Sequence, residues 1–158
     1  MSRPAATISR VEPRASHPRI VRFKTRGASL GLAEARIGDR VRQVERGFSF
    51  TFLESFAAVS GLPVGSIASV LGIPERTLAR RRVTGRFTME ESERLLRIAT
   101  VFEKAAELFE GDVAGAITWL TSPKKALAHE TPLEYSRTEL GAREVENLIG
   151  RLEYGVFS

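Results

Sequence analysis

Apolar side chains recur at helical spacing through most of this chain, and no segment alternates long enough to require a β-sheet. Phe52, Phe56 and Val59, for example, are spaced at i, i+4 and i+7, which places them on one face of a helix. Glycines and prolines separate the periodic segments, as they do at helix ends. The pattern predicts an all-α fold with helices over residues 32–46, 49–60, 63–71, 74–82, 89–110, 112–121 and 142–154.

Local signals mark where two helices begin. Thr88 and Glu91 form a predicted capping box, in which the hydroxyl accepts the Glu91 amide and the carboxylate reaches back to Thr88. Thr131 and Glu134 repeat the pattern, with a proline at the first helical position. After Thr88 a continuous apolar stripe predicts the longest helix; it consists of Leu95, Ile98, Ala99, Phe102, Ala105, Ala106 and Phe109.

Residues 64–82 carry the pattern of a helix-turn-helix. Counted from Val64, the fifth residue is alanine, the ninth glycine and the fifteenth leucine. The small Ala68 lets two helices approach closely, and Gly72 suits the tight turn between them. Leu78 then anchors the second helix to the core, which leaves its other face free to enter a major groove.

The second helix of this motif is rich in arginine, a side chain that suits guanine edges and phosphates. The eighteenth position, usually apolar, is Arg81, so either the helix ends early or Val83 anchors it instead. The alternative interpretation of the segment is two short helices of an ordinary bundle with a solvated end. The predicted DNA-binding residues are Arg76, Thr77, Arg80, Arg81, Arg82 and Arg86.

Residues 1–30 predict a disordered basic tail, because three prolines interrupt any helix and seven basic residues face one acid. Such a segment buries too little apolar surface to offset the entropy of ordering. A transit peptide fits the composition but not the prolines, and residues 20–24 allow a short strand. Residues 31–88 then form the DNA-binding and dimerisation region, and residues 89–158 form a second helical region.

The two ends of the chain differ in charge. Residues 1–48 contain 11 Lys and Arg and 4 acidic residues, whereas residues 90–158 contain 8 and 13. This asymmetry suggests two partners, of which nucleic acid suits the basic part because each neutralised phosphate releases counterions. The alternative is that these charges are only solvated surface.

Nothing in the sequence predicts catalysis. There is no cysteine, and neither His17 nor His129 has a triad or metal-ligand pattern near it, so we expect no enzyme, no cofactor and no metal site. No apolar run approaches the length of a membrane span, and the first 30 residues lack an apolar signal region. We therefore expect a cytoplasmic protein with no membrane partner.

From residue 45 onward the chain carries an ordered set of residues. The set comprises Gly47, residues 77–81, Gly85 and Arg86, residues 90–95, Trp119 and Leu120, residues 131–133, Thr138, Gly141 and Ala142, Val145, and residues 155–158. On this set the chain resembles the Xre/ParS-type antitoxins that accompany RES-domain toxins. It departs at residues 128–130, where the family often has a glycine before its Thr-Pro-Leu, and residues 1–44 lie outside the resemblance.

The resemblance implies a helix-turn-helix half that also forms the dimer, and a C-terminal half that caps the active site of an NAD⁺-degrading RES toxin. It also implies that the complex binds its own operator DNA. The outer side of the last helix and the segment after it are then the toxin-binding part. Its predicted residues are Arg143, Glu146, Asn147, Glu153, Tyr154, Gly155, Val156, Phe157 and Ser158.

A homodimer is also predicted from an aromatic run. Phe48, Phe50, Phe52 and Phe56 exceed what one short helix needs for its own core, and a spare apolar patch often marks an interface. The alternative is that these rings fill the local core. Two other functions stay open: a one-component regulator without a toxin partner, which gene neighbourhood would distinguish, and a helical adaptor without DNA affinity.

Overall fold

The computed structural model describes residues 20–155, and within them the fold is all-α, as the sequence predicts. No strand forms in these residues; Ile20 with Asp112 and Ser49 with Arg86 make isolated bridges only. No single helix among them is long and apolar enough to cross a membrane, and the bent α2–α3 pair meets that test by length and composition alone. The helices are η1 (Ala28–Leu30), α1 (Ile37–Arg46), α2 (Phe50–Ser60), α3 (Val64–Val70), α4 (Glu75–Thr84), α5 (Met89–Leu108), α6 (Val113–Leu120), η2 (Lys125–Leu127), α7 (Pro132–Tyr135) and α8 (Glu139–Glu153).

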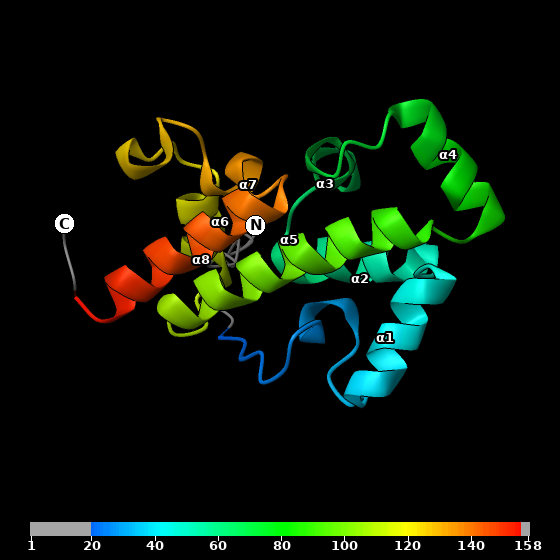
Figure 1. Ribbon diagram of the computed structural model, residues 1–158, viewed down its shortest axis with the longest axis horizontal. Coiled ribbons are helices and arrows are strands. Elements are labelled where there is room, and N and C mark those ends of the chain that lie inside the picture. The colour runs from blue at the N-terminus through cyan, green and yellow to red at the C-terminus, as the bar shows by residue number, and fades with distance from the viewer. Residues whose placement is uncertain (1–19, 156–158) are drawn as a thin grey trace, which may run out of the picture.

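The long helix α5 runs through the middle of the molecule and contacts α1, α2, α6 and α8 (Figure 1). Helix α8 runs parallel to α5, as two ion pairs between the helices show. Arg97 pairs with Glu139 at 3.0 Å and, two turns later on both helices, Lys104 pairs with Glu146 at 2.7 Å. Helices α1 and α4 lie at one end of this arrangement, and the last turn of α8 lies at the other (Figure 1). The predicted apolar stripe of α5 is its buried face, with Phe109 partly buried.

The predicted capping box at the start of α5 is confirmed. The Glu91 amide donates to the Thr88 hydroxyl at 3.1 Å, and the Thr88 amide donates to the Glu91 carboxylate at 3.4 Å. Helix α8 starts at Glu139, before the predicted residue 142, because the Thr138 hydroxyl caps it by accepting the Gly141 amide at 3.0 Å. Side-chain caps therefore set both starts, as expected for helix N-termini.

Residues 20–30 are folded onto α5, which corrects the predicted disordered tail for this segment; residues 1–19 lie outside the described residues. The Val21 amide donates to the Gly111 carbonyl at 3.0 Å, and the Phe23 ring meets the Phe102 ring edge-on at 5.4 Å. Leu30 is only 1% exposed. The basic residues of this segment and the prolines that precede it concealed these apolar anchors. Helix α1 starts at Ile37 because η1 and the turns after it occupy the preceding residues.

A buried carboxylate holds this segment in place. Glu103 of α5 is 7% exposed and accepts the Gly27 amide at 3.0 Å, the Ser29 amide at 2.8 Å and the Ser29 hydroxyl at 2.5 Å. Burial raises the pKa of Glu103, although these hydrogen bonds and the charge of Arg26 act in the opposite direction. No local pattern indicates this contact, because the partners are more than 70 residues apart along the chain.

The four phenylalanines predicted as an interface pack within this chain instead. Phe48, Phe50 and Phe56 are at most 5% exposed, and the partly buried Phe52 stacks on Phe48 with ring centroids 4.7 Å apart. Phe50 stacks in turn on Phe87 at 5.4 Å. The alternative in which these rings fill the local core is therefore correct, and the aromatic run does not support a dimer.

Replacement of Glu103 by Ala should release the N-terminal segment. It leaves the amides of Gly27 and Ser29 without their acceptor, so we expect the free energy of unfolding to fall by roughly 2–4 kcal/mol. Hydrogen exchange of both amides should become fast. Glu107→Ala, an exposed position on the same helix, is the control and should change neither quantity. Slow exchange of both amides in the Glu103→Ala variant would contradict this role.

Candidate nucleic-acid interface and partner surface

Helices α3 and α4 form the predicted helix-turn-helix. Ala68 is 2% exposed, and its carbonyl accepts the Ile73 amide at 2.9 Å. Gly72 has φ of 70°, the left-handed conformation that the turn needs and that glycine adopts without strain. Leu78, 9% exposed, is the buried residue of α4. The structure thus confirms the small residue, the turn and the anchor expected from the sequence.

The face of α4 opposite Leu78 carries arginines. Arg76 and Arg80 are exposed one turn apart, and Thr77 is partly buried beside them. Because a helix turns by about 100° per residue, Arg76 and Arg80 project away from the core while Leu78 projects into it. A face of this kind, free and cationic, has the properties that a duplex major groove requires.

Two further predicted arginines lie where α4 meets the rest of the fold. The Arg82 guanidinium lies 5.3 Å from the centre of the Phe50 ring, and Arg86 donates to the Gly47 carbonyl at 2.6 Å. Gly47 is required there, because a Cβ atom would lie 2.0 Å from the carbonyl oxygen of Phe87. Both arginines remain exposed, so their contact with DNA stays a prediction.

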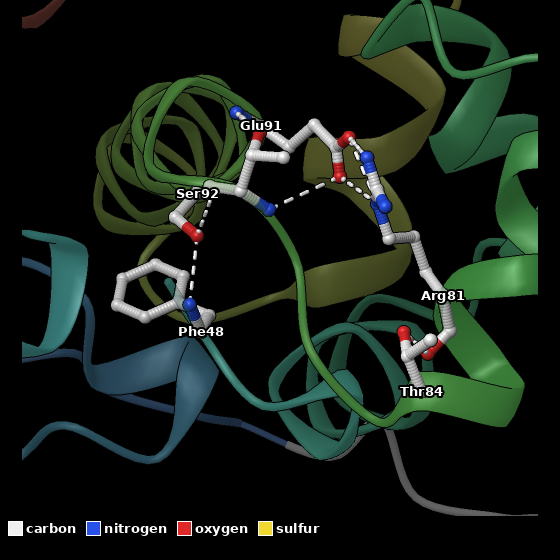
Figure 2. Close-up of polar contacts among 6 residues, drawn as sticks. Phe48, Arg81, Thr84, Glu91 and Ser92 are labelled. Carbon is white, nitrogen blue, oxygen red and sulfur yellow. Dashed lines mark hydrogen bonds and ion pairs between the residues drawn. The ribbon is translucent and has the colours of Figure 1, made fainter. Parts of the chain in front are cut away.

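Arg81 points toward α5 and is bound by Glu91 (Figure 2). Its Nε donates to both carboxylate oxygens at 3.0 and 2.9 Å, and its Nη2 donates to one of them at 2.6 Å. The two side chains are only 18% and 7% exposed. Arg81 therefore anchors α4, which corrects its predicted place among the DNA-facing residues. Neither sequence alternative holds, since α4 continues to Thr84 and Val83 is 88% exposed.

The carboxylate of Glu91 belongs to a small polar cluster. The neighbouring Ser92 hydroxyl donates to the Thr88 carbonyl at 2.6 Å and accepts the Phe48 amide at 2.7 Å, as Figure 2 shows for Phe48. Burial opposes ionisation of Glu91, but the hydrogen bonds from Arg81 and Thr88, with the charges of Arg81 and Arg94, outweigh it and lower its pKa. The same contact raises the pKa of Arg81. The pair is charged at neutral pH.

Helix α8 buries one side and exposes the other. Val145 and Ile149 face the core at 0% and 4% exposure. Of the predicted partner residues, Arg143, Asn147 and Glu153 are exposed, although Arg143 also donates to Glu139 at 3.2 Å. Glu146 is partly buried and paired with Lys104, so it is the least available of the set.

The end of α8 is the most open part of this surface. Tyr154 is 81% exposed and, with Glu146, Asn147, Gly150 and Arg151, lines a shallow hollow. Gly155 has φ of 68°, which turns the chain off the helix axis. Val156, Phe157 and Ser158 lie outside the described residues.

The loop before α7 contains residues 128–130, where the family often has a glycine and this chain does not. Ala128 and His129 have φ of 54° and 67°, the left-handed conformation that glycine adopts most easily. The His129 amide donates to the Lys124 carbonyl at 2.9 Å, which closes the loop. His129 is exposed, and no group of His, Cys, Asp or Glu in residues 20–155 is arranged to hold a metal.

A groove between α1 and α5 is not among the features predicted from the sequence. Helix α1 has no buried residue, and Ile37 and Val41 on its apolar face are 72% and 49% exposed. Met89, 46% exposed, continues the apolar surface on α5. The i, i+4, i+7 spacing of Ile37, Val41 and Val44 places these three side chains on one face of α1. Charges of both signs surround the groove: Arg26, Arg40 and Arg97, with Glu45, Glu93 and Glu139.

Comparison with known proteins agrees with this division of the chain. The family described as the antitoxin Xre-like helix-turn-helix domain matches residues 39–99, and the antitoxin Xre/MbcA/ParS C-terminal toxin-binding domain matches residues 104–155. A protein named Antitoxin Xre from Yersinia enterocolitica is 45% identical over 148 residues, which are 92% of this chain and 99% of that protein. Another of that name, from Photorhabdus laumondii, is 36% identical over 73% of this chain and 78% of its own length.

These matches and the two halves of the fold define the class: a two-part antitoxin that joins a DNA-binding helix-turn-helix to a toxin-binding domain. The chain belongs to the Xre antitoxin family. The alignment with the Yersinia protein covers 92% of the chain, so it extends well into residues 1–44, which the sequence resemblance had left out.

Replacement of Glu91 by Gln should reveal the ion pair through its pH dependence. The variant keeps an acceptor at the start of α5 but loses the charge, so we expect it to be less stable near neutral pH by roughly 1–3 kcal/mol. Because folding lowers the pKa of Glu91, its contribution is present above the ordinary value of 4.5 and is lost as the pH falls through the folded-state value.

Urea unfolding between about pH 7 and pH 3 measures this difference. The gap between wild type and Glu91→Gln should narrow as the solution becomes acidic. Glu90→Gln, at the exposed neighbouring position, is the control and should track wild type throughout. A gap that stays constant with pH would show that the charge of Glu91 does not carry the effect.

Proposed function

We propose that this antitoxin neutralises a cognate RES-domain toxin, which degrades NAD⁺, by blocking its active site, and that it binds its own operator through α4. The observation that carries the proposal is the separation of the two surfaces. The free face of α4 and the end of α8 lie at opposite ends of the molecule (Figure 1). One chain can therefore hold DNA and toxin at the same time.

The DNA arm of the proposal depends on the arginines that α4 does not use internally. Arg76 and Arg80 are exposed and face away from Leu78, so the proposal assigns them to contacts with base edges in the DNA major groove. Thr77, Arg82 and Arg86 flank them and are assigned phosphate contacts. Arginine suits both tasks because its planar fork matches guanine edges and phosphate oxygens.

The toxin arm depends on the outer side and end of α8. Arg143, Asn147 and Glu153 stay exposed while the opposite side of the helix packs on the core, and Glu146 adds its partly buried carboxylate. Tyr154, at 81% exposure, offers a large ring with no cover from the described residues. Gly155 ends the helix, and the proposal assigns Val156, Phe157 and Ser158, which follow it in the sequence, to the toxin active site.

The rival function is a one-component regulator without a toxin. The match of residues 104–155 to a toxin-binding domain favours the antitoxin. No step of the proposed function requires catalysis or a cofactor from this chain. Because the operator is in the cytoplasm, the proposal places the protein there as well.

We also propose that the groove between α1 and α5 is covered by a second copy of the chain. A short helix in water is marginal unless its apolar face packs, and α1 leaves Ile37 and Val41 open. The rim carries both signs of charge, so a two-fold arrangement can set Arg40 and Arg97 against the partner's Glu45 and Glu93. A two-fold pair would also present two α4 helices to successive half-sites.

Truncation after Tyr154 tests the toxin arm. Co-expressed with the toxin gene beside its own, the truncated chain should still form a complex through α8 but should no longer protect growth and cellular NAD⁺. The Arg76→Ala/Arg80→Ala variant is the control, because it should lose operator binding and keep full protection. If the truncated chain protects NAD⁺ as completely as the full chain, the active site must be blocked by another part.

Val41→Asp tests the dimer. A carboxylate in the middle of an apolar interface loses its hydration without a partner, so the variant should sediment as a monomer at micromolar concentration where wild type is a dimer. Thr118→Asp, exposed on α6, is the control and should remain dimeric. Circular dichroism should show equal helix content in both. A monomeric wild type, or a Val41→Asp dimer of unchanged stability, would contradict the proposed interface.

A further inference from the structure

Val83 has no role in the fold. At 88% exposure it is the most exposed large apolar side chain within residues 20–155. The sequence allowed Val83 to anchor α4. In the structure, Leu78 and the ion pair between Arg81 and Glu91 anchor this helix instead. Single exposed apolar residues are common on protein surfaces, so the exposure of Val83 alone does not indicate a function. The face of α4 on which Val83 lies does.

That face is the one that α4 turns away from the core. Arg76, Arg80 and Val83 are spaced at i, i+4 and i+7, so they align along one side of the helix. Ala79, also exposed, lies next to them on the same side. The surface that α4 offers to a duplex is therefore two guanidinium groups followed by a small apolar patch.

The last turn of α4 is held firmly, which gives Val83 a fixed position. The Gly85 amide donates to the Arg81 carbonyl at 2.7 Å, and the Gly85 carbonyl accepts the Phe50 amide at 2.8 Å. Arg82, next to Val83, lies over the Phe50 ring. A β-branched side chain in a helix also has one strongly preferred χ1 rotamer. A contact made by Val83 thus costs little conformational entropy.

Base edges in the major groove offer one apolar group, the C5-methyl of thymine, which cytosine lacks. We propose that Val83, with Ala79 beside it, contacts a thymine methyl group in each operator half-site and makes the chain prefer thymine at that position. The inference depends on the proposed operator binding through α4, and it assigns Val83 to sequence preference rather than to phosphate affinity.

Deoxyuridine substitution tests this contact, because it removes only the methyl group. Duplexes are first selected from a random library by the full-length wild-type protein. Each thymine of the best duplex is then replaced singly by deoxyuridine, and affinities of wild type and Val83→Ala are measured by fluorescence anisotropy at one salt concentration. One thymine per half-site should weaken wild-type binding by about fourfold, the effect of one buried methyl group.

Val83→Ala should bind the thymine duplex more weakly by a similar factor and should be insensitive to deoxyuridine at that same position. Its salt slope should match wild type, because Val83 carries no charge that neutralises a phosphate. Leu140→Ala, 74% exposed on α8, is the control and should reproduce the wild-type deoxyuridine profile. Alanine favours helix more than valine does, so the variant should keep its fold.

A wild-type profile with no sensitive thymine would overturn the inference while leaving operator binding intact. So would a Val83→Ala variant that keeps the full deoxyuridine penalty. A library from which no sequence is enriched would instead contradict operator binding itself, and the inference would fall with it.

Discussion

The position of α4, the helix that we propose to face DNA, depends on one ion pair. Helix α4 has a single buried residue, Leu78, which cannot by itself fix both the tilt and the rotation of a ten-residue helix. The bidentate contact between Arg81 and Glu91 adds the missing constraint, and the same carboxylate caps α5 through Thr88. A planar guanidinium fixes direction as well as distance, which an apolar contact at this position would not do.

Helix α5 joins the two halves of the antitoxin into one body. Its first turn holds α4, Glu103 near its end holds residues 27–29, and its outer side pairs with α8. The two family matches, to residues 39–99 and 104–155, meet inside this helix. The DNA-binding and toxin-binding parts therefore share a continuous core and are not separate domains joined by a linker.

Features set by neighbours in sequence could be predicted, and features set by distant partners could not. The cap at Thr88 and the turn at Gly72 depend on residues a few positions away, so their patterns were sufficient. Arg81 looked DNA-facing because its partner lies on another helix, and residues 20–30 looked disordered because Glu103 is far along the chain. The aromatic run suggested an interface, but its rings are covered within the chain by residues distant in sequence, such as Phe87 and Phe102.

The division of α4 into two sides has an evolutionary consequence. Everything that holds the helix lies on one side or at its end, in Leu78, Arg81, Arg82 and Gly85. Arg76, Ala79, Arg80 and Val83, on the other side, are exposed. Substitutions on the free side leave the anchoring intact and cost little stability. With operator binding through α4 as proposed, duplicated copies in one genome can thus acquire different operators in a few mutational steps, and each toxin gene can come under separate control while the protein fold stays the same.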